Sequence, residues 1–512
     1  MSSRLENSAR NIKWGVIGQF LTIFFNFASR TVFLYCFTKE YVGVGSLFLG
    51  IFSVLSLADL GMETSMTVHL YKPLAHNDIS KIKAYLLFYK KAYYYIALII
   101  TLLGLSLLPF LHYIVDIPDN VNQVEWIYIL TLANTTVSYL FIYRKILLVA
   151  DQKKYITDII QYVRMLSQFV VLIPILIIFK DYLLYLFVQI IFTILYNIIV
   201  MYKAKKVYPF IDELSEELDS KSRQIIKRDM IALSLHRVGD VVNQNAVTLL
   251  TGSFVNVIAV AVFSNYQILI THVKTLLDKV YYSVSPSVGN LTAESAVERA
   301  HDVLMKFVFA SFWITTFTAT ALLCLLNPFI QLWIGESYLF NEHVVFLIVV
   351  SFILVNMRKP ALIFKEAYGL FANDQWRPLV ESFINVGISI VSVKVMGMGL
   401  SGILLGGIVS SLLTSWWIEP YILFSKGFRI KCAGYFKHYL LYVFVMFVIM
   451  FICKMLCTNI SSDIIGFVFK ILVVIVVPNF LIFMVYRNNK YYVWIINIII
   501  NRIKPLMKKK SK

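Results

Sequence analysis

The chain has 512 residues, of which 59% are hydrophobic and 15% are charged, and its mean hydropathy is +0.74. Ordinary soluble domains are roughly 45–50% apolar and about 25% charged, so the composition excludes a soluble enzyme and a globular domain with a single anchor. The net charge of +18 raises the alternative of a nucleic-acid-binding protein, and the positions of the charges decide against it.

Apolar segments of ~20 residues recur along the chain and predict about fourteen transmembrane helices. They cover residues 12–37, 42–67, 86–115, 124–148, 155–179, 182–202, 229–252, 254–286, 303–327, 341–363, 378–397, 400–425, 437–457 and 464–486. A basic segment, 487–512, follows and is expected to lie at the membrane interface. The predicted fold class is therefore an all-α polytopic membrane protein.

Lysine and arginine residues gather in alternate loops. With the N-terminus inside, the inner segments are 68–91, 144–154, 203–228, 287–302, 358–377, 426–437 and the two tails. Together they contain roughly 36 of the 47 Lys and Arg residues. The opposite loops, such as "DIPDNVNQVE", are acidic or neutral. This asymmetry predicts that both termini are cytoplasmic.

Five of the predicted helices carry polar residues at steps of three or four, which places them on one face. The stripes are Gln19, Thr22, Asn26, Ser29 and Arg30; Ser56, Asp59, Glu63 and Thr67; Thr157, Gln161, Arg164 and Gln168; Arg237, Asp240, Gln244, Thr248 and Thr251; and Glu381, Asn385, Ser389 and Ser392. Ionisable residues inside membrane helices indicate functional sites. Interhelical hydrogen bonding is the alternative for each stripe, and snorkelling towards the outer surface is a further alternative for Arg30.

Among the striped helices, the first and seventh predicted spans are six helices apart, and so are the fifth and eleventh. This spacing is expected for a tandem repeat of two six-helix halves. The predicted organisation is an N-terminal lobe (1–202), a cytoplasmic linker (203–228), a C-terminal lobe (229–425), two additional helices (426–486) and the basic tail (487–512). In the twelfth span, Gly402 and Gly406 have the spacing that favours close helix packing.

Several kinds of chemistry lack their sequence signatures. There is no Gly-rich phosphate loop followed by Lys and Ser or Thr, no HExxH motif and no paired-cysteine metal set, and the five cysteines are scattered. The outer loops are too short for the catalytic domain of a polymerase or glycosyltransferase. We therefore expect a protein that moves a substrate, with no enzymatic activity, metal or organic cofactor.

Three segments of the first half carry a family resemblance: "EYVGVGSLFLGIFSVLSLADLG" (40–61), "HLYKPLAHNDISKIKAYLLFYKKAYYYI" (69–96) and "RKILLVADQKKYI" (144–156). They resemble the oligosaccharide-lipid flippases that export O-antigen and capsule repeat units in bacteria, members of the multidrug/oligosaccharidyl-lipid/polysaccharide exporter superfamily. The second half is similar mainly by topology. The resemblance implies fourteen helices, two MATE-like pseudo-twofold lobes around a cleft, and alternating access without ATP. It also implies an undecaprenyl-diphosphate-linked oligosaccharide as cargo and a bacterial plasma-membrane location.

Such a cargo needs cations for its diphosphate and neutral hydrogen-bonding groups for its glycan. Guanidinium groups bind phosphate oxygens bidentately and stay protonated. The predicted substrate-binding residues are Arg30, Arg164, Arg237, Asn26, Gln161, Gln168, Gln244 and Asn385. Members of the family carry positive charge in the cleft, and Arg30 matches the first-helix position expected for it. The carboxylates predicted to pair with these cations, or to bind a coupling proton or sodium ion, are Asp59, Glu63, Asp240 and Glu381.

The expected partners are the lipid-linked oligosaccharide, membrane lipids, and the glycan polymerase and glycosyltransferases of the same pathway, without nucleic acid. Three alternatives stay open at this level. A multidrug/ion antiporter of the same superfamily would favour an aromatic, acidic cleft. A lipid-linked peptidoglycan-precursor flippase would obey the same physics. A non-transporting scaffold for glycan assembly would tolerate neutralisation of the stripe charges.

Overall fold

The computed structural model describes residues 2–56, 62–115, 118, 120–140, 142–212, 217–294 and 297–509. Contacts divide the chain into two compact units, Met1–Ser264 (unit 1) and Asn265–Lys512 (unit 2). The helix that corresponds to the predicted seventh span packs against the second span within unit 1. The division by contacts thus falls later than the predicted linker 203–228, and the lobe boundaries stay a prediction.

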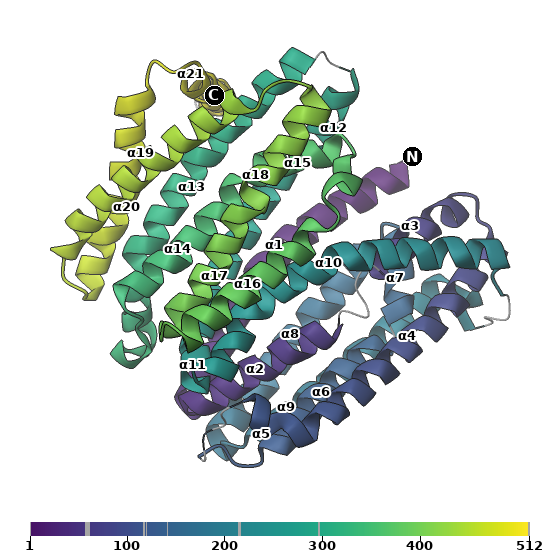
Figure 1. Cartoon of the computed structure of the whole chain (residues 1–512). Coiled ribbons are helices and arrows are strands. Elements are labelled where there is room, and N and C mark those ends of the chain that lie inside the picture. Colours follow the sequence, from purple (N-terminus) through teal and green to yellow (C-terminus); the bar gives the residue numbers. More distant parts are fainter. Residues whose placement is uncertain are drawn as a thin grey trace. The chain divides into compact units, whose positions relative to one another are not determined.

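The regular structure of the described residues is helical (Figure 1). The helices that begin in unit 1 are α1 (Ser2–Cys36), α2 (Lys39–Leu55), α3 (Met62–Ala75), α4 (Ile79–Leu107), α5 (Leu111–Ile114), α6 (Val124–Tyr139), α7 (Ile142–Ala150), α8 (Lys154–Phe179), α9 (Tyr182–Val207), α10 (Ser220–Phe254) and α11 (Val257–Tyr282). Those of unit 2 are α12 (Ser285–Glu294), α13 (Val297–Ile334), α14 (Glu342–Met357), α15 (Lys359–Ala367), α16 (Arg377–Lys394), α17 (Gly399–Leu413), α18 (Ser415–Ile422), α19 (Ala433–Thr458), α20 (Ile464–Tyr486) and α21 (Lys490–Lys509). Short 3-10 turns, η2 (Leu108–Phe110), η3 (Pro209–Asp212), η4 (Glu336–Tyr338) and η5 (Leu370–Asp374), and a π-helical turn, η6 (Leu423–Phe428), connect or extend them.

Ten helical segments of the described chain are long and apolar enough to cross a membrane, or eleven if the bent pair α6–α7 is one span. The predicted spans 42–67, 229–252 and 378–397 are not among them. They contain α2 with α3, α10 and α16: α2 has only 17 residues and is separated from α3 by residues that are not described, whereas α10 and α16 carry polar stripes that lower their hydropathy. The all-α, multi-pass membrane architecture is therefore confirmed, and the count of fourteen spans stays a prediction.

Aspartate residues begin four of the helices. Asp78, Asp181, Asp219 and Asp463 each accept a hydrogen bond from the backbone N–H three residues later, at 2.8–3.1 Å. Such a cap satisfies one of the N–H groups that a helix start leaves unpaired. The capping bond from the Lys81 amide also lowers the pKa of Asp78 below its ordinary value. The turns that precede α4, α9, α10 and α20 are thus encoded locally.

Helices α1 and α8 run parallel and in close contact within unit 1. The Asn11 side chain accepts a hydrogen bond from the Tyr155 amide at 2.8 Å, and the Tyr162 hydroxyl donates to the Trp14 carbonyl at 3.1 Å. Gly18 permits this approach, because a Cβ atom there would lie 1.7 Å from the Tyr162 ring. Since the partners advance together along both helices, the polar stripes of α1 and α8 lie on neighbouring elements.

Two predicted spans are broken at the same place. In unit 1, α6 has 16 residues and is followed by α7 with 9 residues, at an angle of 44°. In unit 2, α14 has 16 residues and α15 has 9. The second break has a local cause, because Pro360 near the start of α15 has no N–H with which to continue the helix. These are the fourth and tenth predicted spans, so the shared break supports the six-helix repeat.

In unit 2, α16 and α17 pack closely as a helical hairpin (Figure 1). A Cβ atom on Gly402 would lie 2.7 Å from the Cβ of Ser392, and one on Gly406 would lie 2.1 Å from the hydroxyl of Ser389. The Ser389 hydroxyl also donates to the Ile403 carbonyl across the pair at 3.3 Å. The predicted small-residue packing at Gly402 and Gly406 is confirmed.

This packing predicts a difference between adjacent glycines. Gly406→Ala should destabilise the protein by about 1–3 kcal/mol, the usual cost of overpacking, because its Cβ would also lie 2.8 Å from the backbone oxygen of Asn385. Gly407→Ala is the matched control, since its Cβ would meet nothing closer than 3.9 Å. Thermal unfolding of the purified protein checks the difference. Equal unfolding temperatures for the two variants would contradict it.

Candidate functional site

The polar face of α8 is a hydrogen-bonded group. Arg164 donates through Nε to Gln161 and through Nη1 to Gln168, each at 3.2 Å. Its guanidinium carbon lies 5.6 Å from the centroid of the Tyr196 ring on α9. The structure thus brings together three predicted site residues, as their steps of three and four residues indicated. Their binding role stays a prediction.

Two carboxylates lie close enough to Tyr196, beside Arg164, for their charges to affect its hydroxyl. The charges of Glu63 on α3 and Asp158 on α8 reach the Tyr196 hydroxyl together with that of Arg164. Both carboxylate side chains are partly buried. Glu63 was predicted, whereas Asp158 was not, because the predicted stripe passes through the neighbouring residue Thr157. The group around Tyr196 therefore contains one cation and two anions.

Arg30 lies towards the other end of the α1–α8 pair. Its Nη2 donates to the hydroxyl of Ser264 on α11, and its charge acts on the hydroxyls of Tyr182 and Tyr185 at the start of α9. The ring of Phe33, one turn farther along α1, lies 5.3 and 5.5 Å from the rings of these two tyrosines. Arg30 is partly buried. Its surroundings are polar hydroxyls and aromatic rings, as expected for a membrane arginine that faces protein.

The two arginines stand at different levels of the same helix pair. The rings of Phe25 and Phe169 are 5.3 Å apart, which places Arg30 level with a residue of α8 about ten positions beyond Arg164. At 1.5 Å per residue, the two levels are about 15 Å apart. Asn26, a further predicted site residue, lies between these levels on α1 and is exposed. Unit 1 thus carries two cationic positions along one pair of helices.

The predicted stripes of the second and seventh helices are described only in part. Asp59 lies outside the described residues, and the side chains of Arg237 and Asp240 on α10 lie outside what the structure describes. Gln244 is exposed. One polar link between α10 and α2 is the bond from Asn245 to the Ser53 hydroxyl at 3.1 Å, which was not predicted because these residues belong to neither stripe.

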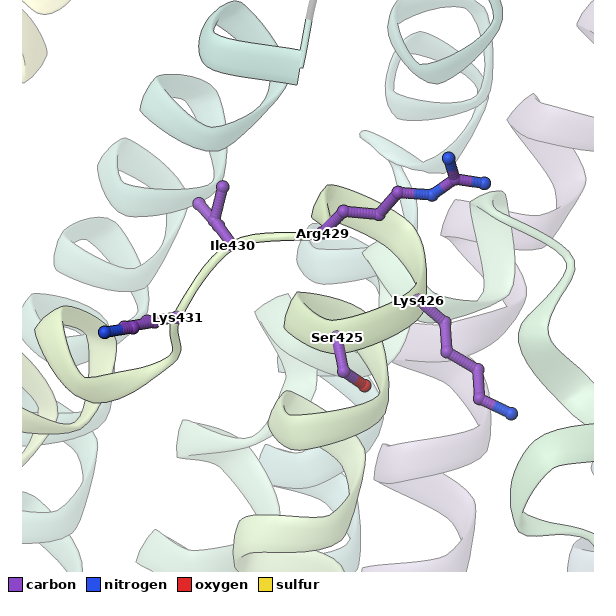
Figure 2. A pocket seen from close by; sticks show the side chains of 5 residues that line it. All are labelled: Ser425, Lys426, Arg429, Ile430 and Lys431. Carbon is purple, nitrogen blue, oxygen red and sulfur yellow. The ribbon is translucent and has the colours of Figure 1, made fainter.

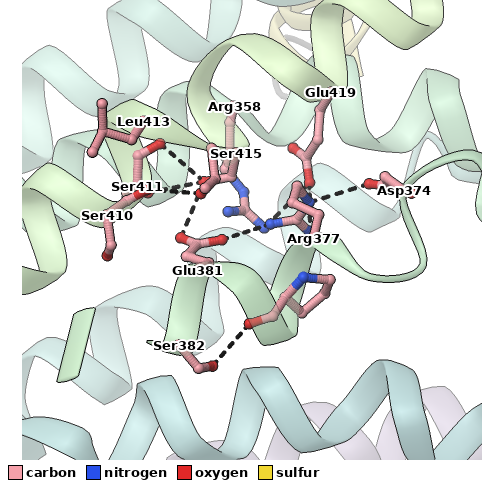
Figure 3. A network of polar contacts seen from close by, with 12 residues as sticks. Arg358, Asp374, Arg377, Glu381, Ser382, Ser410, Ser411, Leu413, Ser415 and Glu419 are labelled. Atoms are coloured by element: carbon pink, nitrogen blue, oxygen red, sulfur yellow. Dashed lines mark hydrogen bonds and ion pairs between the residues drawn. The ribbon is translucent and has the colours of Figure 1, made fainter. Parts of the chain in front are cut away.

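In unit 2, six ionisable side chains form a buried network of three cations and three anions. Its members are Arg358, Lys365, Asp374, Arg377, Glu381 and Glu419. Figure 3 shows Arg377 at the centre: its nitrogens lie 3.2 Å from Asp374, 2.7 Å from Glu381 and 3.0 Å from Glu419. Lys365 is ion-paired with Asp374, and Arg358 lies 3.5 Å from Glu419, whose side chain is fully buried.

Two predicted site residues belong to this region. Glu381, for which pairing and ion coupling were both predicted, is ion-paired with Arg377 and also accepts a hydrogen bond from Ser415 at 3.2 Å. These contacts favour the pairing role. Asn385 is buried and accepts a bond from Ser389 at 3.3 Å in the α16–α17 contact. Its position favours helix packing over substrate binding.

A basic hollow of about 730 Å³ lies at the turn that follows α18, lined by Ser425, Lys426, Arg429, Ile430 and Lys431. Figure 2 shows the Lys431 side chain pointing away from those of Lys426 and Arg429. The three cations therefore do not converge on one bound group. Their position in the predicted inner segment 426–437 suits contact with the anionic membrane surface.

Comparison with solved structures identifies the fold. The chain is similar to the lipid II flippase MurJ in an inward closed conformation, with 14% identity and a TM-score of 0.64 over 94% of this chain and 99% of MurJ. It is also similar to a multidrug resistance MATE family transporter of the MOP superfamily: the inward-facing form gives 13% identity and a TM-score of 0.60 over 79% of this chain and 94% of that one, and the outward-facing form gives 12% and 0.53 over 80% and 92%. No family sequence model and no curated protein sequence matches the chain. The chain therefore shares the fold of these transporters.

Proposed function

We propose that the protein flips undecaprenyl-diphosphate-linked oligosaccharide units from the cytoplasmic to the outer leaflet of the bacterial plasma membrane, by alternating access, for surface polysaccharide assembly. The observation that carries the proposal is the Arg164 group on α8, in which a guanidinium and two amides share one face of a membrane helix. A cation with neutral hydrogen-bonding groups beside it suits a diphosphate joined to a sugar. A cationic drug would not favour these residues.

The cargo explains why two cationic positions are useful. A diphosphate cannot cross ~30 Å of hydrocarbon unaided, and Arg164 and Arg30 stand at levels about 15 Å apart. Each arginine would replace part of the water that the phosphate oxygens lose. Asn26, Gln161 and Gln168 would bind hydroxyl groups of the sugar. The polyprenyl chain needs no site, because it stays in lipid while the headgroup moves.

The carboxylates near Tyr196 supply a coupling device. When they are ionised, Glu63 and Asp158 would each add a negative charge near Tyr196 and Arg164, which disfavours a diphosphate there. Protonation of both carboxyls would make the same surroundings more positive by two charges. Protons taken up from one side would thus admit the cargo, and their release would favour its departure. We therefore propose a proton as the coupling ion, with no ATP required.

A flippase of lipid-linked peptidoglycan precursor is the second candidate. The specific observation in its favour is the extent of similarity to the lipid II flippase MurJ, which covers 94% of this chain against 79% for the MATE transporter. The resemblance of residues 40–96 and 144–156 to oligosaccharide-lipid flippases favours the polysaccharide cargo instead. Glycosyltransferases and a polymerase would then be its pathway partners.

Deletion of the gene in a strain without a redundant flippase tests the proposal. We expect the undecaprenyl-linked oligosaccharide to accumulate in the inner leaflet, while the lipid-linked peptidoglycan precursor still reaches the outer leaflet. The opposite pattern would support the second candidate. Normal transfer of both lipids would refute a flippase of either kind.

The same leaflet assay tests coupling. The double variant Glu63→Gln, Asp158→Asn is expected to lose the dependence of flipping on the proton gradient, because its site no longer changes charge. Lys180→Asn, which alters an exposed cation at the turn between α8 and α9, serves as a control and should keep that dependence. A double variant that still responds to the gradient would place the coupling group elsewhere.

A further inference from the structure

An eight-residue pattern occurs twice in the chain. "DQKKYITD" runs from Asp151 to Asp158, and "DQWRPLVE" runs from 374 to 381. Both have Asp and Gln at the first two positions, a cation at the fourth and a carboxylate at the eighth. The fourth residue is the first residue of a helix in each case, Lys154 of α8 and Arg377 of α16. Each copy also follows a span broken into 16 and 9 residues.

In unit 2 the charges of the pattern are all bound to one another. Arg377 contacts both carboxylates of its own copy, Asp374 at 3.2 Å and Glu381 at 2.7 Å. Lys365 of α15 adds a second cation to Asp374, and Glu419 of α18 adds an anion to Arg377 at 3.0 Å. The side chains of these five residues are 0–10% exposed. The copy thereby joins α15, η5, α16 and α18.

In unit 1 the same positions are differently partnered. Asp151 accepts a hydrogen bond from the Tyr208 hydroxyl at 2.5 Å and is ion-paired with Lys153 at 2.6 Å. Burial, and then this bond to Asp151, raise the pKa of Tyr208 above its ordinary range. Lys154 is exposed, and within the described chain no ion pair joins it to Asp158. The last carboxylate instead acts on Tyr196, beside Arg164.

We infer that one ancestral charge motif has diverged into two devices: a structural clamp of paired charges in unit 2, and in unit 1 a partly buried carboxylate, Asp158, on the same helix as Arg164. The clamp holds the half-spans α15 and α18 against α16. Because its cations are already neutralised by buried carboxylates, the copy in unit 2 offers no free charge to an anion. The second half of the inference rests on the proposed function and assigns handling of the cargo's charge to unit 1.

Equivalent substitutions in the two copies separate these devices. In the purified full-length protein without cargo, Arg377→Gln is expected to lower the apparent Tm by more than about 5 °C, because it leaves a buried network with excess negative charge. Lys154→Gln, at the matching position, is expected to leave the Tm unchanged. A failure of Arg377→Gln alone to yield folded protein agrees with the clamp. Equal Tm shifts for the two variants would overturn it.

A second measurement does not depend on that variant. Lys365→Met and Asp374→Asn each remove one member of a buried ion pair, and the double variant removes a cation and an anion together. We expect the double variant to lose less Tm than the two single variants lose in sum. Additive losses would overturn the clamp. These Tm measurements need no flipping assay, so a failure of the clamp can be distinguished from a failure of the proposed function.

Asp158→Asn tests the assignment to unit 1. It should alter the pH profile of flipping and leave the Tm unchanged. A shifted Tm with an unaltered pH profile would overturn the assignment.

Discussion

Arg30→Ala is expected to reduce delivery of the lipid-linked oligosaccharide to the outer leaflet by about 10- to 100-fold. Hydrogen bonds to charged groups contribute about 1.5–3 kcal/mol each, and alanine would remove the guanidinium group and its hydrogen bonds. Arg30→Lys keeps the charge and loses the bidentate geometry, so partial activity is expected. The Ser264 hydroxyl accepts a hydrogen bond from the Arg30 guanidinium and so helps to hold it in place. Ser264→Ala should therefore also reduce transport, but less than Arg30→Ala.

The leaflet assay in a complemented deletion strain measures this effect. Lys180→Asn is a suitable control, because Lys180 is an exposed cation at the turn between α8 and α9 and its left-handed backbone, with φ of 48°, suits asparagine. If Arg30 only anchored the helix by snorkelling to the outer surface, lysine would serve equally well, and Arg30→Lys would keep full transport activity. Full activity in Arg30→Ala would show that the residue has no part in transport.

The helical periodicity of the sequence predicted which side chains meet on α8. Gln161, Arg164 and Gln168 are separated by three and four residues, and this spacing alone brings their side chains to one face. The contacts that could be predicted from this spacing are therefore local ones, between residues one turn apart on the same helix. Gly402 and Gly406 belong to the same class, since a small-residue spacing on one helix implies close approach of some neighbour.

The buried network could not be predicted in the same way. The partners of Arg377 include Glu419, which lies on another helix, and Asp374, which is also ion-paired with Lys365 of the preceding broken span. Their pairing depends on how α15, α16 and α18 pack, and periodicity within one helix carries no information about that. The prediction for Glu381 therefore left charge pairing and ion coupling open, and its ion pair with Arg377 corresponds to the first of these. Asp158 was missed for a simpler reason, because the stripe continues from Gln161 back to Thr157 and Asp158 lies beside that stripe.

The polar faces also explain the uncertain count of spans. A membrane helix that binds a hydrophilic cargo must carry polar residues, and these lower the hydropathy by which spans are recognised. The helices α10 and α16 are not among the segments recognised as long and apolar enough to cross a membrane. In a protein of this fold, the segments least recognisable as membrane spans are thus the ones with the most polar faces.

Glu419→Gln is expected to destabilise the protein by about 3–5 kcal/mol, the typical result of removing one partner from a buried ion pair. The Glu419 side chain is fully buried, and its Oε1 lies 3.0 Å from Arg377 and 3.5 Å from Arg358. Glutamine keeps the shape and removes the charge, so three buried cations would face two carboxylates. Chemical or thermal unfolding in detergent micelles measures the loss.

Two further variants decide whether charge causes that loss. Asp302→Asn breaks partly exposed ion pairs with Lys306 and Lys490 in the same unit and should cost only about 0–1 kcal/mol for each. The double variant Glu419→Gln, Arg358→Met removes one anion and one cation, and restores equal numbers of the two signs. It should recover most of the stability, because a buried pair replaced by apolar groups is often neutral. A double variant less stable than Glu419→Gln alone would show instead that Arg358 contributes mainly through packing.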